Sequence, residues 1–224
     1  MSAPTAPASV VPDDAISVQH DPVAVTVVSS TSPIDAGDPS ILGLPIFAAA
    51  SIALGLTLVG LVSDAAAGTP IAIIFAATGI GLLISTVWAI RVGQTMVASV
   101  FGLFAGFWLS YAALVLGLTH NWYLVPPGDV ADTQLIFQIT WAVVFGALTF
   151  ASVRLPSGFT LVFGLVVLSL VLLIIGNLTT STFPVRLAGI TALAFAGVGV
   201  YLFLAAASAA TGGRPYSIGR PLAR

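Results

Sequence analysis

The side chains that catalysis or metal binding would require are nearly absent from this 224-residue chain. It contains no Cys, no Lys and no Glu, and its two histidines, His20 and His120, lie far apart in the sequence. An active site needs a nucleophile–base pair, a metal-ligand cluster or a phosphate-binding loop, and the sequence offers none of these. We therefore expect no catalytic residue, no metal site and no cofactor, and we expect that the protein is not an enzyme.

The balance of apolar and charged residues indicates the environment of the protein. Hydrophobic residues make up 58% of the chain and charged residues 6%, whereas a soluble domain carries about 25% charged residues. So few charges cannot cover a surface in water, and a lipid bilayer is the expected surrounding. The formal net charge of −2 argues against nucleic acid as a partner, because nucleic-acid binding needs a basic face.

Six apolar stretches are long enough to cross a bilayer, which takes roughly 20 mostly apolar residues in a helix. None has a charged residue at its centre, as the cost of a charge in hydrocarbon predicts. The expected fold class is an all-α membrane protein, a compact bundle of six transmembrane helices. The predicted spans are Ile41–Val62, Pro70–Ile90, Thr95–Leu118, Leu135–Val153, Phe159–Leu178 and Pro184–Ala207.

The two ends of the chain are more polar than the apolar region between them. We expect a disordered acidic N-terminal tail (1–39), a transmembrane domain (40–208) and a basic C-terminal tail (209–224). The N-terminal tail contains Asp and Pro but no Lys or Arg, so it does not resemble a signal peptide. With six spans, five arginines fall on the side of both termini and only Arg186 falls on the other. The positive-inside rule then predicts a multi-pass protein of the cell membrane with both termini in the cytoplasm.

Two features inside the predicted spans have more than one interpretation. Gly102 and Gly106 form a G-x-x-x-G step, for which tight helix packing is favoured; the alternative is that small residues leave room for a pore. Asn177 lies near a membrane boundary, where hydrogen bonding at a helix end is favoured and a contact with substrate is the alternative.

Three short motifs resemble those of the acetate uptake transporter family, whose bacterial members include the succinate–acetate permeases. The first precedes the first span as Asp38-Pro39-Ser40-Ile41-Leu42-Gly43-Leu44 and matches the family's Asn-Pro-Ala-Pro-Leu-Gly-Leu at four of seven positions. The second motif consists of Gly93-Gln94-Thr95 at the start of span three and the pair Phe107-Trp108 further along the same span. The third motif is Ile175-Gly176-Asn177 at the end of span five. The motif residues of the first stretch are Asp38, Pro39, Leu42, Gly43 and Leu44.

The resemblance implies a central pore in each subunit and assembly of the subunits as a hexamer. It implies passage of acetate and related short monocarboxylates, with succinate as a further candidate, either linked to a proton or as the neutral acid. It also implies a constriction made by one side chain from each of spans one, three and five, which by position are Phe47, Phe104 and Val166. A hydrophobic ring can gate by dewetting, and it penalises a bare carboxylate far more than the neutral acid.

The chain departs from the family pattern along the implied pore. The family usually has Tyr at the position of Phe104 and Leu at the position of Val166. It has a polar stretch with Asn and His where this chain has Gly55-Leu56-Thr57-Leu58, and a Gln where this chain has Leu82. The polar residues left to line the pore are Thr57, Thr95, Ser99 and Asn177.

The expected function is therefore a membrane transporter or channel for a small carboxylate. Two alternatives stay open. The apolar lining is compatible with a passive channel for another small neutral solute, and the acidic tail with a non-transporting membrane sensor or assembly protein.

Overall fold

The computed structural model describes residues 37–62, 68–214 and 216–223, and every structural statement below concerns these residues. Most of the predicted N-terminal tail lies outside them. The described chain is all-helical, without a strand, and contains six helices that are long and apolar enough to cross a membrane. The predicted fold class and the number of spans are confirmed.

The six spans are built from seven α-helices and three short helical segments of other types. The first span is α1 (Ser40–Leu58), the third is α4 (Thr95–Thr119), the fifth is α6 (Ser157–Thr179) and the sixth is α7 (Thr182–Ala210). The second span comprises α2 (Thr69–Ala72), the π-helical η2 (Ile73–Gly79) and α3 (Ile80–Arg91), and the fourth comprises η3 (Pro127–Asp129), α5 (Val130–Ala151) and η4 (Ser152–Arg154).

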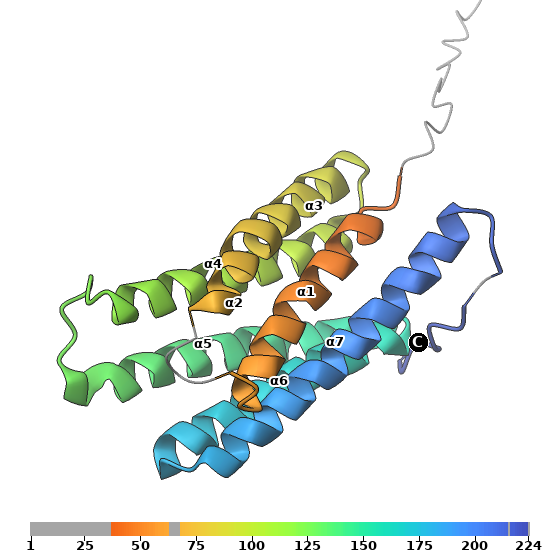
Figure 1. Ribbon diagram of the computed structural model, residues 1–224. Coiled ribbons are helices and arrows are strands. Elements are labelled where there is room, and N and C mark those ends of the chain that lie inside the picture. Colours follow the sequence, from red (N-terminus) through yellow and green to blue (C-terminus); the bar gives the residue numbers. More distant parts are fainter. Residues whose placement is uncertain (1–36, 63–67, 215, 224) are drawn as a thin grey trace, which may run out of the picture. The chain divides into compact units, whose positions relative to one another are not determined.

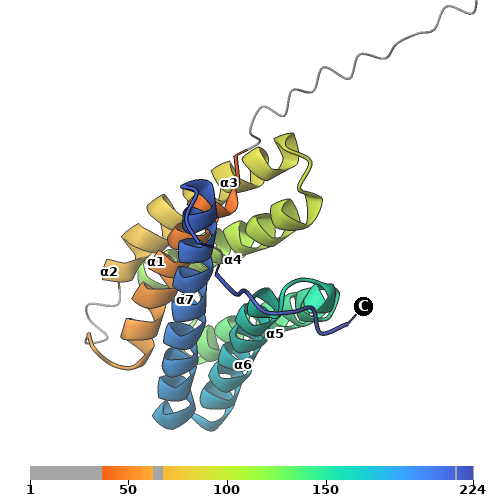
Figure 2. The same ribbon diagram turned by 90° about the vertical axis from the view of Figure 1, so that its right-hand side faces the viewer.

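The spans are arranged as a ring around a shared interior (Figures 1 and 2). Helix α1 packs against α7 and α3, α7 against α6, α6 against α5, and α3 against α4. The ring closes between α4 and α5 through aromatic side chains, since the ring centroid of Phe107 lies 5.7 Å from that of Phe137 and 5.4 Å from that of Trp141. The backbones of α4 and α5 therefore stand further apart than those of the other neighbours, and side chains fill the gap.

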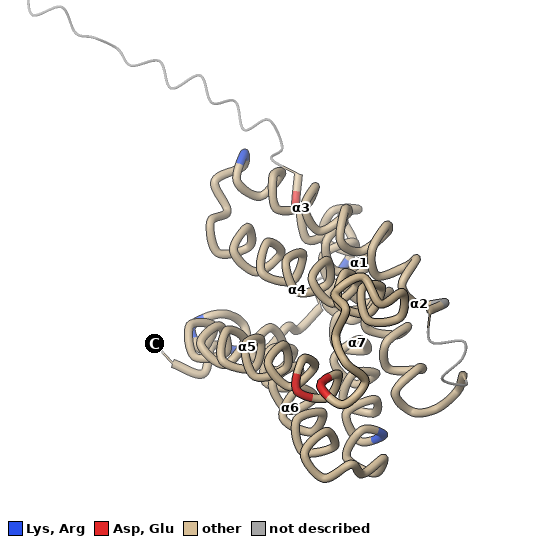
Figure 3. Tube along the Cα trace, turned by 90° about the vertical axis from the view of Figure 1, so that its left-hand side faces the viewer, with Lys and Arg blue, Asp and Glu red and all other residues tan. Residues whose placement is uncertain are grey.

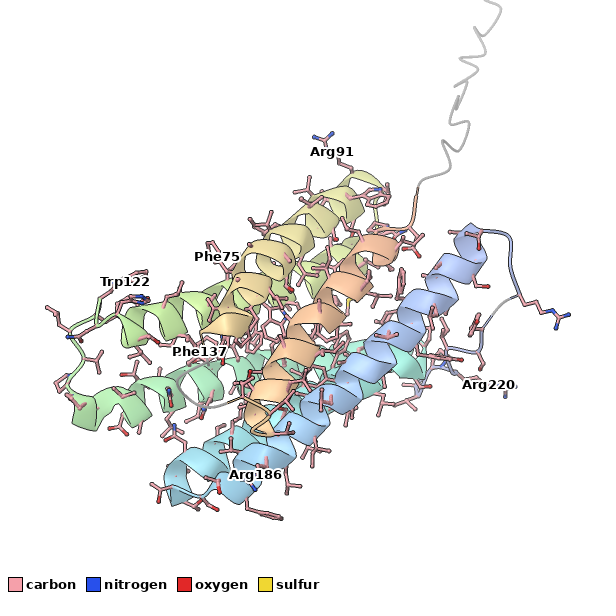
Figure 4. The ribbon with its side chains drawn as sticks, in the orientation of Figure 1. Phe75, Arg91, Trp122, Phe137, Arg186 and Arg220 are labelled. Atoms are coloured by element: carbon pink, nitrogen blue, oxygen red, sulfur yellow. The ribbon has the colours of Figure 1, made fainter. Side chains whose placement is uncertain are left out.

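Charged residues are few and lie at the ends of the helices (Figure 3). Arg91 ends α3, and Arg186 lies in the first turns of α7 at the opposite end of the bundle (Figure 4). The middle of the bundle is left to apolar and uncharged polar residues, because a charge in hydrocarbon is costly.

Three spans show features that were not expected from the sequence. Helix α1 ends at Leu58 and not at Val62, because the chain turns at Gly60, whose φ of +84° suits a residue without a Cβ atom. The second span contains a π-helical segment, within which the Thr78 hydroxyl donates to the carbonyl oxygen of Ile46 at 2.9 Å and joins this span to α1. Helix α5 begins at Val130, five residues before the predicted start at Leu135.

The early start of α5 has an electrostatic explanation. Asp129 occupies the position that precedes the helix, and Asp132 lies in the first turn. Carboxylates at this end favour the helix because the first N–H groups have no intrahelical acceptor. The predicted span began only at Leu135 because the residues before it are more polar. Polar residues can nevertheless form the first turn of a helix.

The backbones of α1 and α7 approach each other closely at two glycines. A Cβ atom on Gly189 would lie 2.8 Å from the backbone nitrogen of Val59, and one on Gly55 would lie 3.1 Å from the carbonyl oxygen of Gly189. Cβ atoms on Gly102 and Gly106 would meet their nearest neighbours at 3.4 Å, an ordinary contact. Close helix packing in this protein therefore depends on the α1–α7 glycines more than on the G-x-x-x-G step of α4.

The C-terminal segment (216–223) lies against the ends of α5, α6 and α7. The carbonyl oxygen of Ile218 accepts a hydrogen bond from the Gly158 N–H at 3.1 Å, and the N–H groups of Leu222 and Ala223 donate to the carbonyl oxygen of Val153 at 2.9 and 3.0 Å. Ile218 also packs against the hydrophobic core. These contacts attach the segment to the turn between α5 and α6.

One hydrogen bond of this segment allows a matched test. The Tyr201 hydroxyl donates to the carbonyl oxygen of Ser217 at 2.8 Å. We expect Tyr201→Phe to lower the free energy of unfolding by about 0.5–1.5 kcal/mol, as for the loss of one such bond. Denaturant titration in detergent micelles measures the change. Tyr216→Phe is the control, because this exposed hydroxyl donates no hydrogen bond within the described residues; equal effects of the two variants would contradict the role of Tyr201.

Candidate functional site

Five phenylalanine side chains from five helices meet in the middle of the bundle, and we call them the aromatic barrier. They are Phe47 of α1, Phe104 of α4, Phe145 of α5, Phe163 of α6 and Phe195 of α7, and each is at most 3% exposed. The ring centroid of Phe104 lies 4.6 Å from those of Phe47 and Phe145 and 6.0 Å from that of Phe163. The Phe195 ring contacts Phe47 at 5.8 Å. Such edge-on and tilted contacts fill the centre of the ring of helices.

Two cavities meet at Phe104, which lines both. The wide cavity has a volume of about 350 Å³ and extends toward the α4–α5 connection, where Thr119, Gln134 and Asn177 contribute to its wall. The narrow cavity has a volume of about 100 Å³ and extends toward the opposite end of the bundle, where Ser40 and Phe159 line it. The aromatic barrier therefore separates two spaces that together follow the axis of the bundle.

Of the three side chains expected at the constriction, two belong to the aromatic barrier and the third lies beside it. Phe47 and Phe104 are in direct contact and both line the narrow cavity. Val166 is buried in α6 and lines the wide cavity, together with Phe104. Phe145, Phe163 and Phe195 were not anticipated. Only Phe163 had a signal in the sequence, because it precedes Val166 by three residues and so shares its helix face.

The four polar residues expected to line the pore do not share one location. Asn177 lines the wide cavity, and its Nδ2 donates to the carbonyl oxygen of Ala131 at 2.9 Å, which joins the end of α6 to the start of α5. Among the described residues that line the two cavities, Thr57, Thr95 and Ser99 do not appear. The hydroxyls of Thr57 and Ser99 donate to carbonyl oxygens one turn earlier in their own helices, at 2.9 and 3.0 Å. Within α4, the cavity face carries Met96, Val97 and Val100 instead of Thr95 and Ser99.

The wide cavity contains polar side chains that were not expected from the sequence. Gln134 and Gln138 lie one turn apart on α5, and Trp108 and Tyr111 lie one turn apart on α4. Residues three or four positions apart share a helix face, so the Gln134–Gln138 spacing was a usable signal. No described residue in the wall of this cavity is charged.

The residues of the N-terminal motif build the start of α1. The carboxylate Oδ1 of Asp38 accepts a hydrogen bond from the Ser40 N–H at 2.9 Å, which satisfies one of the free donors of a helix start. Pro39 is fully buried and Leu42 is half-buried. A Cβ atom on Gly43 would overlap the ring of Phe101, and Leu44 lines the narrow cavity. The motif therefore fixes the first turn of α1 at the mouth of the narrow cavity.

The ring of six apolar spans defines a multi-pass membrane protein. Its two cavities lie on either side of the aromatic barrier, along the direction in which the helices cross the bilayer. The chain belongs to the GPR1/FUN34/yaaH family, whose model matches residues 23–215. A solved structure described as that of the bacterial acetate channel SatP has the same fold, with a TM-score of 0.72 and 23% sequence identity over 82% of this chain and 99% of that chain. These findings confirm the resemblance to the acetate uptake transporter family. A comparison with curated proteins found no match.

Proposed function

We propose that the protein is a channel or transporter for acetate and related short monocarboxylates. The observation that carries the proposal is the pair of cavities that meet at Phe104, in a chain of the GPR1/FUN34/yaaH family with the fold of an acetate channel. In this proposal the substrate enters one cavity, passes the aromatic barrier and leaves by the other.

The properties of the barrier support passage of the acid with its proton, either as the neutral acid or in a proton-linked step. Its five side chains are aromatic hydrocarbons without a polar group, and a bare carboxylate loses its hydration at such a place without compensation. A hydrophobic constriction can also exclude water and ions when it is closed. Succinate carries two carboxyl groups and is the less favoured substrate on these grounds.

Orientation, location and assembly are part of the same proposal. Arg91, Arg154 and Arg220 lie on the side of the bundle where α1 begins and α7 ends, whereas Arg186 lies on the opposite side, which favours cytoplasmic termini in a cell membrane. Protease cleavage of the C-terminal segment in inverted vesicles but not in right-side-out vesicles is the expected result.

The hexamer rests on family resemblance, and the mass of the detergent-solubilised assembly tests it.

Uptake of labelled acetate into proteoliposomes tests the function. We expect uptake above that of empty vesicles, and faster uptake at acidic than at neutral pH, because the protonated fraction of the acid is larger there. The absence of protein-dependent uptake at both pH values would refute the proposal.

A passive channel for another neutral solute is the second candidate, and the uncharged wall of the wide cavity favours it. A swelling assay with acetate, succinate, glycerol, urea and ammonia separates the two candidates. Entry of the uncharged solutes without entry of acetate would favour the second. Entry of none of the five would favour a non-transporting role.

A further inference from the structure

Two polar atoms beside the wide cavity are buried without a hydrogen-bond partner among the described residues. They are the indole Nε1 of Trp108 and the side-chain Oε1 of Gln138, and both side chains line the cavity. Other polar side chains in the same wall donate to backbone carbonyl oxygens: Ser169 to Ala188 at 3.0 Å and Asn177 to Ala131 at 2.9 Å. Since buried polar groups in native proteins are almost always paired, an unused donor and an unused acceptor at one cavity require an explanation.

The two side chains approach the cavity from different helices. Trp108 follows Phe104 by one turn on α4, so it lies on the wide-cavity side of the aromatic barrier. Gln138 follows Phe137 on α5, and the Phe137 ring lies 6.0 Å from the ring of Tyr111, which in turn lies 6.3 Å edge-on from the ring of Trp108. Trp108 of α4 and Gln138 of α5 therefore both belong to the wall of the wide cavity, on the side where these two helices face each other (Figure 4 shows Phe137 between these helices).

The chemistry of the two atoms selects the protonation state of a guest. The indole N–H can only donate, and the amide oxygen can only accept. An undissociated carboxyl group has a carbonyl oxygen that accepts and a hydroxyl that donates, so it can satisfy both. A carboxylate has only acceptors and would leave the Gln138 oxygen unpaired. Rotation of the amide would offer an N–H₂ group to the anion, but no described side chain of the cavity supplies a positive charge to offset its desolvation.

We propose that Trp108 and Gln138 form a subsite that recognises the undissociated carboxyl group of a short carboxylic acid, within the wide cavity on one side of the aromatic barrier. This inference rests on the proposed function and specifies the form of the substrate: the neutral acid passes, and no separate proton site is needed. It also predicts a second kind of substrate. A primary amide such as acetamide has the same acceptor and donor pattern and the same size as acetic acid, and it does not ionise.

The test uses proteoliposomes of the full chain, with a pH-sensitive dye in the lumen and an imposed potassium diffusion potential. Neutral acid brings its proton along, so acetate entry is expected to acidify the lumen and to be insensitive to the potential. Acetamide is expected to enter at a rate that does not change between acidic and neutral pH. Acetate entry that follows an inside-positive potential without acidification, or exclusion of acetamide, would overturn the inference and leave the proposed function standing. Acetate entry absent under all conditions would instead overturn the proposed function.

Substitutions assign the effect to the two side chains. Gln138→Leu removes the acceptor, and Trp108→Phe removes the donor but keeps an aromatic ring. Each substitution is expected to lower the entry rates of acetic acid and of acetamide by the same factor, roughly three- to tenfold, which is the effect of losing one neutral hydrogen bond. Thr140→Val is the control, because Thr140 is exposed on α5 and its hydroxyl, among the described residues, donates only to the Ile136 carbonyl oxygen of its own helix. Parental rates in both folded test variants would contradict the subsite.

Discussion

Replacement of Phe104 by Ala is expected to raise acetate flux by at least about tenfold and to admit solutes that the parent excludes. Phe104 contacts three other rings of the aromatic barrier and lines both cavities. Truncation at Cβ is expected to join spaces of about 350 and 100 Å³, because Phe104 lines both. A fall of about 1.4 kcal/mol in the barrier to passage already gives a tenfold change in rate. Stopped-flow measurement of acetate entry gives the change in flux, and the same measurement with glycerol shows whether an excluded solute is admitted.

The control for this prediction must remove a ring without opening the path. Phe203 of α7 is half-buried at the edge of the core and lines neither cavity. Phe203→Ala should change stability but leave acetate flux and glycerol exclusion close to those of the parent. Because truncation of a buried Phe costs about 3–5 kcal/mol, the Phe104→Ala protein must first be shown to be folded by size-exclusion chromatography. A folded variant with parental flux would show that the aromatic barrier does not limit passage.

Replacement of Gly189 by Leu is expected to destabilise the bundle strongly. A Cβ atom at this position would lie 2.8 Å from the backbone nitrogen of Val59 and 2.9 Å from Cβ of Leu58. Since a backbone atom cannot turn aside as a side chain can, α1 and α7 would have to separate, at a cost of about 1–3 kcal/mol or more. Association of helices in lipid relies on this close packing, because burial of apolar surface supplies little drive there. The measurement is the fraction of protein that stays monodisperse after heating in detergent.

Gly146→Leu is the matched control for Gly189→Leu. Gly146 also lies within a spanning helix, but no atom outside its own stretch of helix lies within 4 Å of the position that its Cβ atom would take. The control should therefore keep the thermal profile of the parent, while Gly189→Leu loses most of the monodisperse fraction at a lower temperature. Equal profiles would mean that the α1–α7 contact is not essential for the bundle.

The number and approximate bounds of the spans could be predicted from the sequence because lipid imposes one requirement on every spanning segment. Each must be apolar for about 20 residues and satisfy its backbone groups internally. The third span shows how closely this rule worked, since Thr95–Leu118 was predicted and Thr95–Thr119 was found. The fourth shows its limit, since Asp132 is polar yet lies within α5.

The composition of the candidate site could be predicted only in part. Phe47 and Phe104 were found through family position, and the structure places their rings 4.6 Å apart. Ser99 was expected at the pore but is exposed, while Gln138 was missed. A spanning helix is apolar on its lipid face and on its inner face, so its sequence does not mark which face turns inward as it does in a soluble amphipathic helix.

By itself, the sequence therefore determined that the protein crosses the membrane six times and which family it resembles. Only the tertiary structure decided that five rings close the centre, that α1 and α7 touch at Gly55 and Gly189, and that Trp108 and Gln138 share one cavity. The physical reason is that the solvent, the lipid, acts on each span separately, whereas the rotation of each helix about its axis depends on the side chains of its neighbours.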